Sequence, residues 1–116
     1  MEGRDGEGWL RTQAGTDCYM APEMHLGRWY NGAKIDIFEI AIVLFIMFTG
    51  QPAFRAAKSN DAWYKYLAHK RGDLFWRAHQ RHTFSDEFKA LLEGMFAFKP
   101  EERFSIENIK DSAWFN

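Results

Sequence analysis

The clearest hydrophobic pattern in the sequence lies over residues 34–49, which contain no glycine or proline. Residues 40–48 form an unbroken apolar run, and the glycine and proline within residues 50–52 mark its end. β-branched residues would suit a strand, but the length of the segment favours a helix. Because this helix has no polar face after Glu39, we expect protein to cover every side of it.

The same segment has to be compared with a membrane span. A spanning helix needs about 20 apolar residues, whereas the run over residues 40–48 has nine. Asp36 and Glu39 also stand just before it. The pattern therefore predicts a buried core helix, and no membrane association is expected.

Shorter helices are predicted on both sides of this one. A proline suits the first turn of a helix over residues 21–27, and residues 59–68 carry apolar side chains at helical spacing. Ser85 can cap a helix over residues 86–96, and Ser105 can cap a last short helix. The apolar face of the 86–96 helix consists of Phe88, Leu91, Leu92, Met95 and Phe96. Nothing indicates a strand pair, so we predict a mostly helical fold with long loops.

Composition limits the class of protein further. The 116 residues are 47% hydrophobic and 17% aromatic, which is typical of one globular domain or a part of one. A net charge of −1 gives no reason to expect nucleic-acid binding. Cys18 is the single cysteine, so no internal disulfide can form, and a reducing intracellular (cytoplasmic) location is predicted.

Motifs for metals and for nucleophilic catalysis do not occur in the sequence. There is no cysteine pair and no His-Glu-x-x-His arrangement, and Cys18 has no neighbouring histidine. No glycine-rich loop followed by Lys-Ser/Thr is present either. We therefore expect no metal site in this chain.

Three motifs, in a fixed order, carry the functional information. Residues 15–23 read Gly-Thr-Asp-Cys-Tyr-Met-Ala-Pro-Glu, and residues 99–105 read Lys-Pro-Glu-Glu-Arg-Phe-Ser. Between them, residues 36–41 read Asp-Ile-Phe-Glu-Ile-Ala and residues 49–54 read Thr-Gly-Gln-Pro-Ala-Phe. Together they resemble the later part of the eukaryotic protein kinase domain, from the end of the activation segment through the C-terminal lobe.

The type of kinase can be narrowed from the same residues. Tyrosine kinases usually have Trp in place of Tyr19 and lack the preceding Gly-Thr, so the chain resembles the serine/threonine kinases, in particular the calcium/calmodulin-dependent group. The resemblance implies the helical C-lobe portion of a kinase-like fold, without the N-lobe β-sheet and the catalytic loop. Residues 1–116 would be a partial kinase domain, with the rest of the activation segment over residues 1–23 and C-lobe helices over residues 24–116.

The resemblance also implies roles near the substrate. Thr16 would hydrogen-bond the catalytic aspartate and lysine of the complete domain and so help to position the acceptor hydroxyl. Tyr19 and Met20 would shape the pocket for the substrate residue that follows the acceptor. Thr12 is a candidate phosphorylation site, because phosphate there would order the loop against an arginine, but a plain loop threonine is equally open.

Three further residues have structural roles in the family. Glu23 and Arg103 would form a buried ion pair that ties the activation segment to the later helices, and bidentate arginine–carboxylate geometry suits such a dry site. Asp36 would accept backbone N–H bonds from the catalytic loop. The alternative for Asp36 is a carboxylate in the first turn of its helix, favoured by the helix dipole.

Phosphoryl transfer needs parts that these 116 residues do not contain. They are a glycine-rich loop, a Lys–Glu pair, a catalytic-loop aspartate with its asparagine, and an Asp-Phe-Gly that binds Mg²⁺. We therefore expect no catalytic residue here, and ATP and Mg²⁺ are implied only for the complete domain. We also expect one side of the 34–49 helix to be exposed, because the elements that cover it in the family are absent.

Two functions remain open at this point. The chain can be a C-lobe fragment of an ATP-dependent kinase that phosphorylates protein Ser and Thr hydroxyls, inactive when isolated. Alternatively, it is a non-catalytic, kinase-derived interaction module. The expected partners are protein substrates and either the missing N-terminal kinase portion or another kinase.

Overall fold

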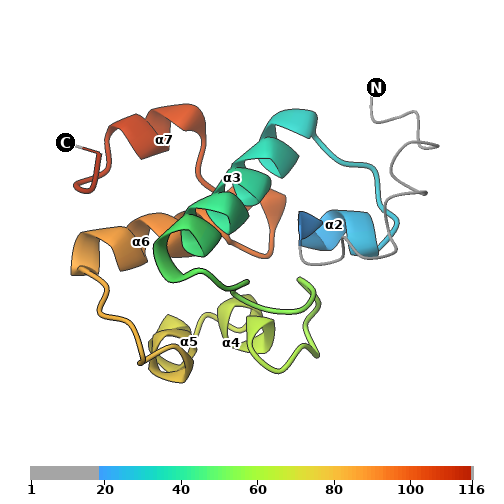
Figure 1. The fold of residues 1–116 in the computed structure, drawn as a ribbon. Helices are drawn as coiled ribbons and strands as arrows, with labels where there is room; N and C mark the ends of the chain where they lie inside the picture. Colours follow the sequence, from blue (N-terminus) through green and yellow to red (C-terminus); the bar gives the residue numbers. More distant parts are fainter. Residues whose placement is uncertain (1–18, 116) are drawn as a thin grey trace.

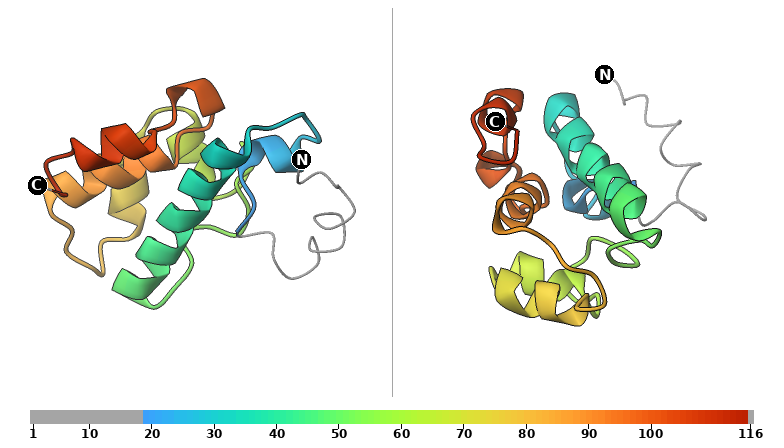
Figure 2. Two further views of the ribbon diagram at one scale, coloured as in Figure 1. Left: turned by 90° about the horizontal axis from the view of Figure 1, so that it is seen from above. Right: turned by 60° about the vertical axis from the view of Figure 1, so that its left-hand side comes forward.

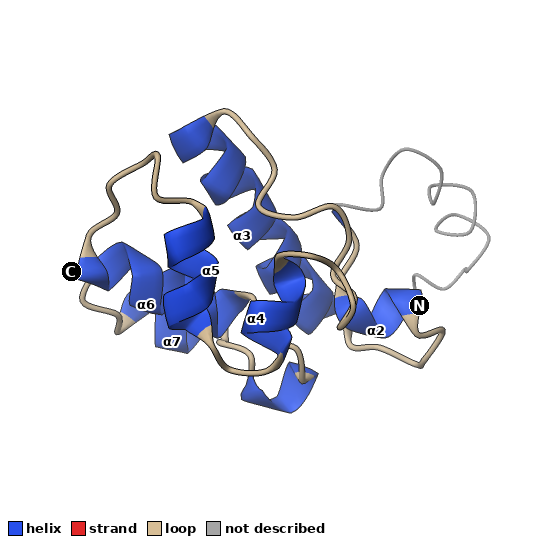
Figure 3. Cartoon of the chain, turned by 90° about the horizontal axis from the view of Figure 1, so that it is seen from below, coloured by secondary structure: helices blue, strands red, loops and turns tan. Residues whose placement is uncertain are grey.

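The computed structural model describes residues 19–115, which form short and medium helices joined by long loops (Figure 1). Figure 3 shows helices and loops over this range, and no strand occurs in it. The prediction of a mostly helical fold is therefore confirmed. The elements are α2 (Pro22–His25), α3 (Gly32–Thr49), α4 (Tyr64–Ala68), α5 (Gly72–Ala78), α6 (Asp86–Met95), the 3-10 helix η2 (Pro100–Glu102) and α7 (Ile106–Lys110).

The longest helix, α3, begins and ends on local signals. The Asn31 side chain accepts a hydrogen bond from the backbone N–H of Ala33 at 2.8 Å, which caps the helix slightly before its predicted start. At the other end Gly50 adopts a left-handed conformation with φ of 81°, and its N–H donates to the carbonyl of Ile46. Glycine takes this conformation without strain, so the helix ends at Thr49 as predicted.

One side of α3 packs against the rest of the chain, and the other does not. In the right-hand view of Figure 2, α6 and α7 lie on one side of α3. The buried side chains of α3 are Ile35, Ile37, Phe38, Ala41, Ile42 and Phe45. By contrast, Ile40, Val43 and Met47 are 45%, 46% and 76% exposed. The expectation that protein covers every side of this helix is thus wrong within residues 19–115. The other expectation, that one side of the helix is exposed, agrees with these residues.

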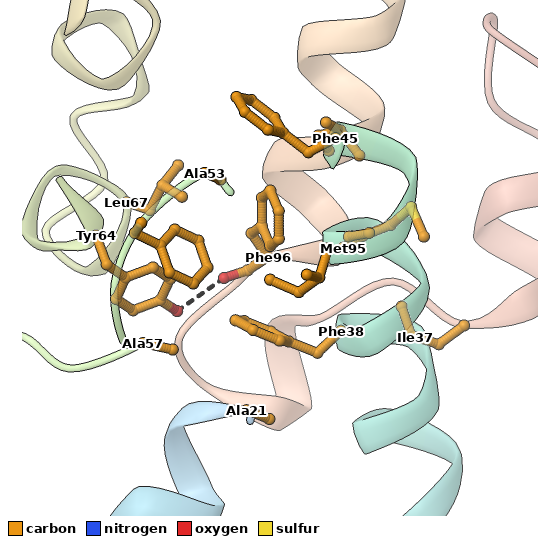
Figure 4. Packing of buried hydrophobic residues seen from close by; sticks show 14 of the residues in the cluster. Ala21, Ile37, Phe38, Phe45, Ala53, Ala57, Tyr64, Leu67, Met95 and Phe96 are labelled. Carbon is orange, nitrogen blue, oxygen red and sulfur yellow. Dashed lines mark hydrogen bonds between the residues drawn. The ribbon is translucent and has the colours of Figure 1, made fainter. Parts of the chain in front are cut away.

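The core is built mainly from aromatic rings around Phe38 (Figure 4). Its ring lies 5.4 Å from that of Phe96 and 6.0 Å from that of Tyr64, both edge to face. Phe54 fills the remaining side at 6.1 Å. These centroid distances are typical of favourable aromatic pairs, so helix α3, helix α4 and the end of α6 share one core.

The predicted caps of the last two helices are present. The Ser85 hydroxyl accepts from the backbone N–H of Phe88 at 3.1 Å, and all five predicted apolar residues at α6 are buried. Ser105 and Asn108 form a reciprocal capping box at the start of α7. Local chemistry therefore fixes both helix starts, as the sequence indicates.

Other predicted helices differ from those observed. The predicted helix over residues 59–68 is reduced to α4, because the Asp61 carboxylate accepts the N–H groups of Ala56, Trp63 and Tyr64 and holds the preceding residues in turns. Helix α2 is shorter than residues 21–27. Helix α5 was not predicted, since it has no side-chain cap and depends on the burial of Phe75 and Trp76.

His79 is a buried titratable group between these elements. Its Nε2–H donates to the Ala53 carbonyl at 3.0 Å, and its ring lies within 4.9 Å of the rings of Phe45 and Phe75. Burial lowers the pKa of the His79 imidazole, and nearby His82 lowers it further, against the opposing effect of the Ala53 bond. The neutral ring is thus the form that the fold favours.

We predict that His79 makes the fold acid-sensitive. Because its folded-state pKa is depressed, its contribution is complete above about pH 6.5 and is lost as the pH falls through the lower folded-state value. Urea unfolding at about pH 7.5 and about pH 5.5 should show a smaller loss of stability on acidification in His79→Gln than in the natural sequence. Exposed His69 supplies the control, and equal losses in His79→Gln and His69→Gln would contradict this account.

Candidate functional site

Two charged side chains from opposite ends of the described chain meet in the interior. Glu23 lies in the first turn of α2, and Arg103 directly follows η2. Arg103 donates from Nη1 to Oε2 of Glu23 at 2.7 Å and from Nη2 to Oε1 at 2.8 Å. The two side chains are 0% and 4% exposed. The structure therefore brings the two predicted residues together as a bidentate, buried ion pair.

The remaining donors of Arg103 are also satisfied. Its Nε donates to the carbonyl of Ala97 at 3.0 Å, Nη1 also donates to the carbonyl of Lys34 at 3.0 Å, and Nη2 to that of Phe98 at 3.4 Å. A guanidinium has five N–H groups, and each has an acceptor here. The cation also lies 5.1 Å from the centre of the Phe38 ring. Burial of the charge is thus compensated on every side.

Lys34 completes this arrangement, and its role was not visible in the sequence. Its Nζ donates to the backbone carbonyl of Arg103 at 2.9 Å, while its own carbonyl accepts from Arg103. Lys34 and Arg103, which are 69 positions apart, are therefore joined by two hydrogen bonds. Each bond runs from the side chain of one residue to the backbone carbonyl of the other. The start of α3 is fixed to the chain that follows η2.

Tyr64 borders the same charges on the core side. Burial raises the pKa of its phenol far above the ordinary value, the Glu23 carboxylate raises it as well, and the Arg103 cation opposes both. The hydroxyl therefore keeps its proton and donates to the Phe96 carbonyl at 2.8 Å, shown by the dashed line in Figure 4. This bond ties α4 to the end of α6.

The residues predicted to face the substrate are only partly described. Tyr19 is 41% exposed, whereas Met20 is 4% exposed and belongs to the core. Of this pair, Tyr19 is the one that offers its side chain to the surface. Thr12 and Thr16 lie outside the described residues, so their roles stay predictions.

Asp36 and Glu39 lie on the exposed side of α3. Helix α3 begins at Gly32, so Asp36 is not in its first turn and the dipole alternative for this residue is wrong. Within the described part of the chain, neither carboxylate has a hydrogen bond or an ion pair. Burial raises the pKa of the Glu39 carboxyl, and the Asp36 charge adds to this. The family role of Asp36 stays a prediction.

Two features that would point to a particular function are absent from residues 19–115. In residues 19–115 no group of three or more His, Cys, Asp or Glu side chains is placed to hold a metal ion. No helix in the same range is long and apolar enough to cross a membrane. The notable chemistry of this range is therefore the buried ion pair and the exposed side of α3.

The protein kinase domain family matches residues 2–115. The chain belongs to the protein kinase family. It is 34% identical to CBL-interacting serine/threonine-protein kinase 19 of Arabidopsis thaliana over 109 residues. These aligned residues make up 94% of this chain and 21% of that protein. It is also 30% identical to serine/threonine-protein kinase 33 of Mus musculus over 112 residues. These make up 97% of this chain and 22% of that protein.

The predicted resemblance to protein kinases of the serine/threonine class is therefore confirmed. A third relative, CBL-interacting protein kinase 28 of Oryza sativa subsp. japonica, is 34% identical over 114 residues, or 98% of this chain and 25% of that protein. The chain thus spans about a fifth to a quarter of the length of these relatives. Its all-helical described part fits the helical C-lobe portion of the kinase fold.

We predict that Arg103→Ala lowers the free energy of unfolding by about 3–5 kcal/mol. The truncation leaves the Glu23 carboxylate buried without its cation. Urea unfolding monitored by circular dichroism measures the change. Arg71→Ala is the matched control, because Arg71 pairs with Asp73 on the exposed surface, where such a pair contributes little. Equal effects of the two substitutions would refute the assigned role of Arg103.

Proposed function

We propose that the chain forms the substrate-facing and scaffolding part of an ATP-dependent protein serine/threonine kinase. The complete protein would transfer phosphate to Ser and Thr hydroxyls of protein substrates. The observation that carries this proposal is the Glu23–Arg103 pair. It joins the segment containing Tyr19 and Met20 to helix α3 and to the loop after α6, so the surface beside a protein substrate would be held rigidly.

We further propose that ATP and Mg²⁺ are bound by another portion of the complete kinase. The described residues do not fit these ligands, because they include no carboxylate cluster for Mg²⁺ and no glycine-rich loop for phosphate. Within residues 19–115 we assign no step of phosphoryl transfer to a side chain. The isolated 116 residues would then be catalytically incompetent, and their place of action would be intracellular.

The exposed side of α3 supports a role as part of a larger assembly. Ile40, Val43 and Met47 form an apolar stripe that the described residues leave open. Stripes of this kind mark interaction sites in soluble proteins. The missing N-terminal kinase portion, or another kinase, would cover it. The same stripe also favours the second candidate, a non-catalytic module that binds kinases or their substrates.

A domain exchange separates the two candidates. The matching segment of the mouse serine/threonine-protein kinase 33 is replaced by this chain, and phosphate transfer to a Ser-containing peptide is measured. The kinase proposal predicts transfer that is lost when the exposed Tyr19 is replaced by Asp. A folded exchange protein that binds Mg·ATP and transfers no phosphate would contradict it and favour the interaction module.

The isolated chain provides the second test. Titration calorimetry with Mg·ATP should show no binding to the 116 residues, whereas the intact mouse kinase domain should bind under the same conditions. Saturable binding of Mg·ATP to the isolated chain would refute the proposal that another portion of the kinase supplies the nucleotide site.

A further inference from the structure

A polar pocket of about 370 Å³ lies between α5, the loop over residues 79–85 and the first half of α6. Figure 1 shows this loop joining the two helices. The lining combines aromatic rings with cationic and hydrogen-bonding side chains. Its members are Asp73, Trp76, Arg77, Gln80, His82, Thr83, Phe84 and Lys89. We call this cavity the α5–α6 pocket, and the proposed function does not use it.

The aromatic floor of the pocket is held in place by buried contacts. The Trp76 indole N–H donates to Oε2 of Glu93 at 2.6 Å, which joins α5 to α6. The Trp76 ring lies 4.8 Å from that of Phe84, and the Phe84 ring is stacked on that of Phe88 at 6.0 Å. Trp76 and Phe84 are only 6% and 7% exposed. The floor is therefore preformed, so a ligand would not have to order it on binding.

The charges around the pocket leave an excess of positive charge. Arg77 and Lys89 line it from two different helices, and neither has an ion pair or a side-chain hydrogen bond within residues 19–115. The carboxylate in the lining, Asp73, is already engaged, because Arg71 donates to it from Nε at 3.1 Å and from Nη2 at 3.0 Å. The charges of that pair cancel, and the two cations Arg77 and Lys89 remain uncompensated.

These cations lie in a wider basic region of the chain. Residues 55–82 contain seven Lys or Arg against two Asp, a net charge of +5. Both aspartates are engaged, since Asp61 accepts three backbone N–H bonds and Asp73 is paired. Asp86 and Glu87 begin α6 but do not line the pocket. The region would therefore attract an anionic ligand over a Debye length of about 8–10 Å.

A phosphate monoester matches this lining better than a carboxylate does. It carries a charge of about −1.5 to −2 at pH 7 and three strong acceptor oxygens, whereas a carboxylate has a single charge and two oxygens. Arg77 and Lys89 can supply charge-assisted hydrogen bonds to it. Gln80, His82 and Thr83 provide further donors from the loop. The charge of the ligand would then balance the two uncompensated cations.

We propose that the α5–α6 pocket binds a phosphoserine or phosphothreonine residue of another protein. The phosphate would lie between Arg77 and Lys89, and its short aliphatic stem would pack on the part of the aromatic floor that is open. The pocket has room for a side chain as well as its phosphate, and it opens to solvent because Arg77, Gln80 and Thr83 are exposed. A protein that already carries a phosphate would thus be held on the kinase.

This inference rests on the proposed function only for the carrier of the phosphate, because a protein serine/threonine kinase produces that modification. The binding measurement involves neither ATP nor phosphate transfer. A failed domain exchange with successful phosphopeptide binding would leave the inference standing. Kinase activity in the exchange protein without phosphopeptide binding would leave the kinase proposal standing and remove this one.

The test uses three fluorescent peptides with the same uncharged Gly and Ala flanks. They differ only at the central residue, which is phosphoserine, serine or glutamate. Fluorescence anisotropy measures their binding to the full 116-residue chain. The phosphoserine peptide should bind at least about tenfold more tightly than the other two, and added salt should reduce the difference. Inorganic phosphate and vesicles containing phosphatidic acid, added as competitors, separate a free ion and a lipid headgroup from a protein-borne phosphate.

Substitutions at the pocket identify the residues responsible. Arg77→Gln together with Lys89→Gln should abolish the preference for phosphoserine. Arg55→Gln together with Lys58→Gln removes the same charge from exposed positions of the same basic region that do not line the pocket, and should keep the preference. Because Lys89 is half-buried, Arg77→Glu at an exposed position gives a second variant, which should also lose binding with an unchanged circular dichroism spectrum.

Four outcomes would overturn the proposal. The first is equal binding of the phosphoserine and serine peptides. The second is equally tight binding of the glutamate peptide, which would identify an acidic segment as the ligand. The third is a phosphoserine preference that survives the substitutions at Arg77 and Lys89, or that the control pair reduces equally. The fourth is binding of phosphatidic acid vesicles that depends on Arg77, without binding of the phosphoserine peptide.

Discussion

The fold depends on one buried ion pair, between Glu23 and Arg103. Transfer of two charges from water to the interior costs several kcal/mol unless every donor and acceptor finds a partner. Arg103 meets this condition with five hydrogen bonds to four residues, including the backbone carbonyls of Ala97, Lys34 and Phe98. Displacement of α2, of the start of α3 or of the loop after α6 would leave part of this network unsatisfied. The three segments therefore hold their positions together.

The central helix α3 is packed on one side only within residues 19–115. After Glu39 its sequence is apolar on all sides, yet the aromatic core around Phe38 and Phe45 covers only one of them. On the other side Ile40, Val43 and Met47 remain in water. Soluble monomers rarely expose large contiguous apolar patches, and those that do use them mainly for binding. This one-sided packing agrees with two findings. The chain belongs to the protein kinase family, and it spans about a fifth of the length of its relatives.

The sequence predicted those parts of the fold that local chemistry determines. Gly50 ends α3 through its left-handed conformation, and Ser85 caps α6 with its own hydroxyl. Features that depend on distant contacts were missed, such as α5, which has no cap of its own. The Lys34 contact was missed for the same reason. The pairing of Glu23 with Arg103 came from the family resemblance, because 80 residues separate them and no spacing rule links them.

A double-mutant cycle on the ion pair tests the central claim most directly. The free energy of unfolding is measured for the natural chain, Glu23→Gln, Arg103→Met and the double variant. If the pair holds the three segments together, the two single changes are strongly non-additive, with a coupling of about 2–3 kcal/mol. Additivity within about 0.5 kcal/mol would show that the two side chains act independently and would contradict the account.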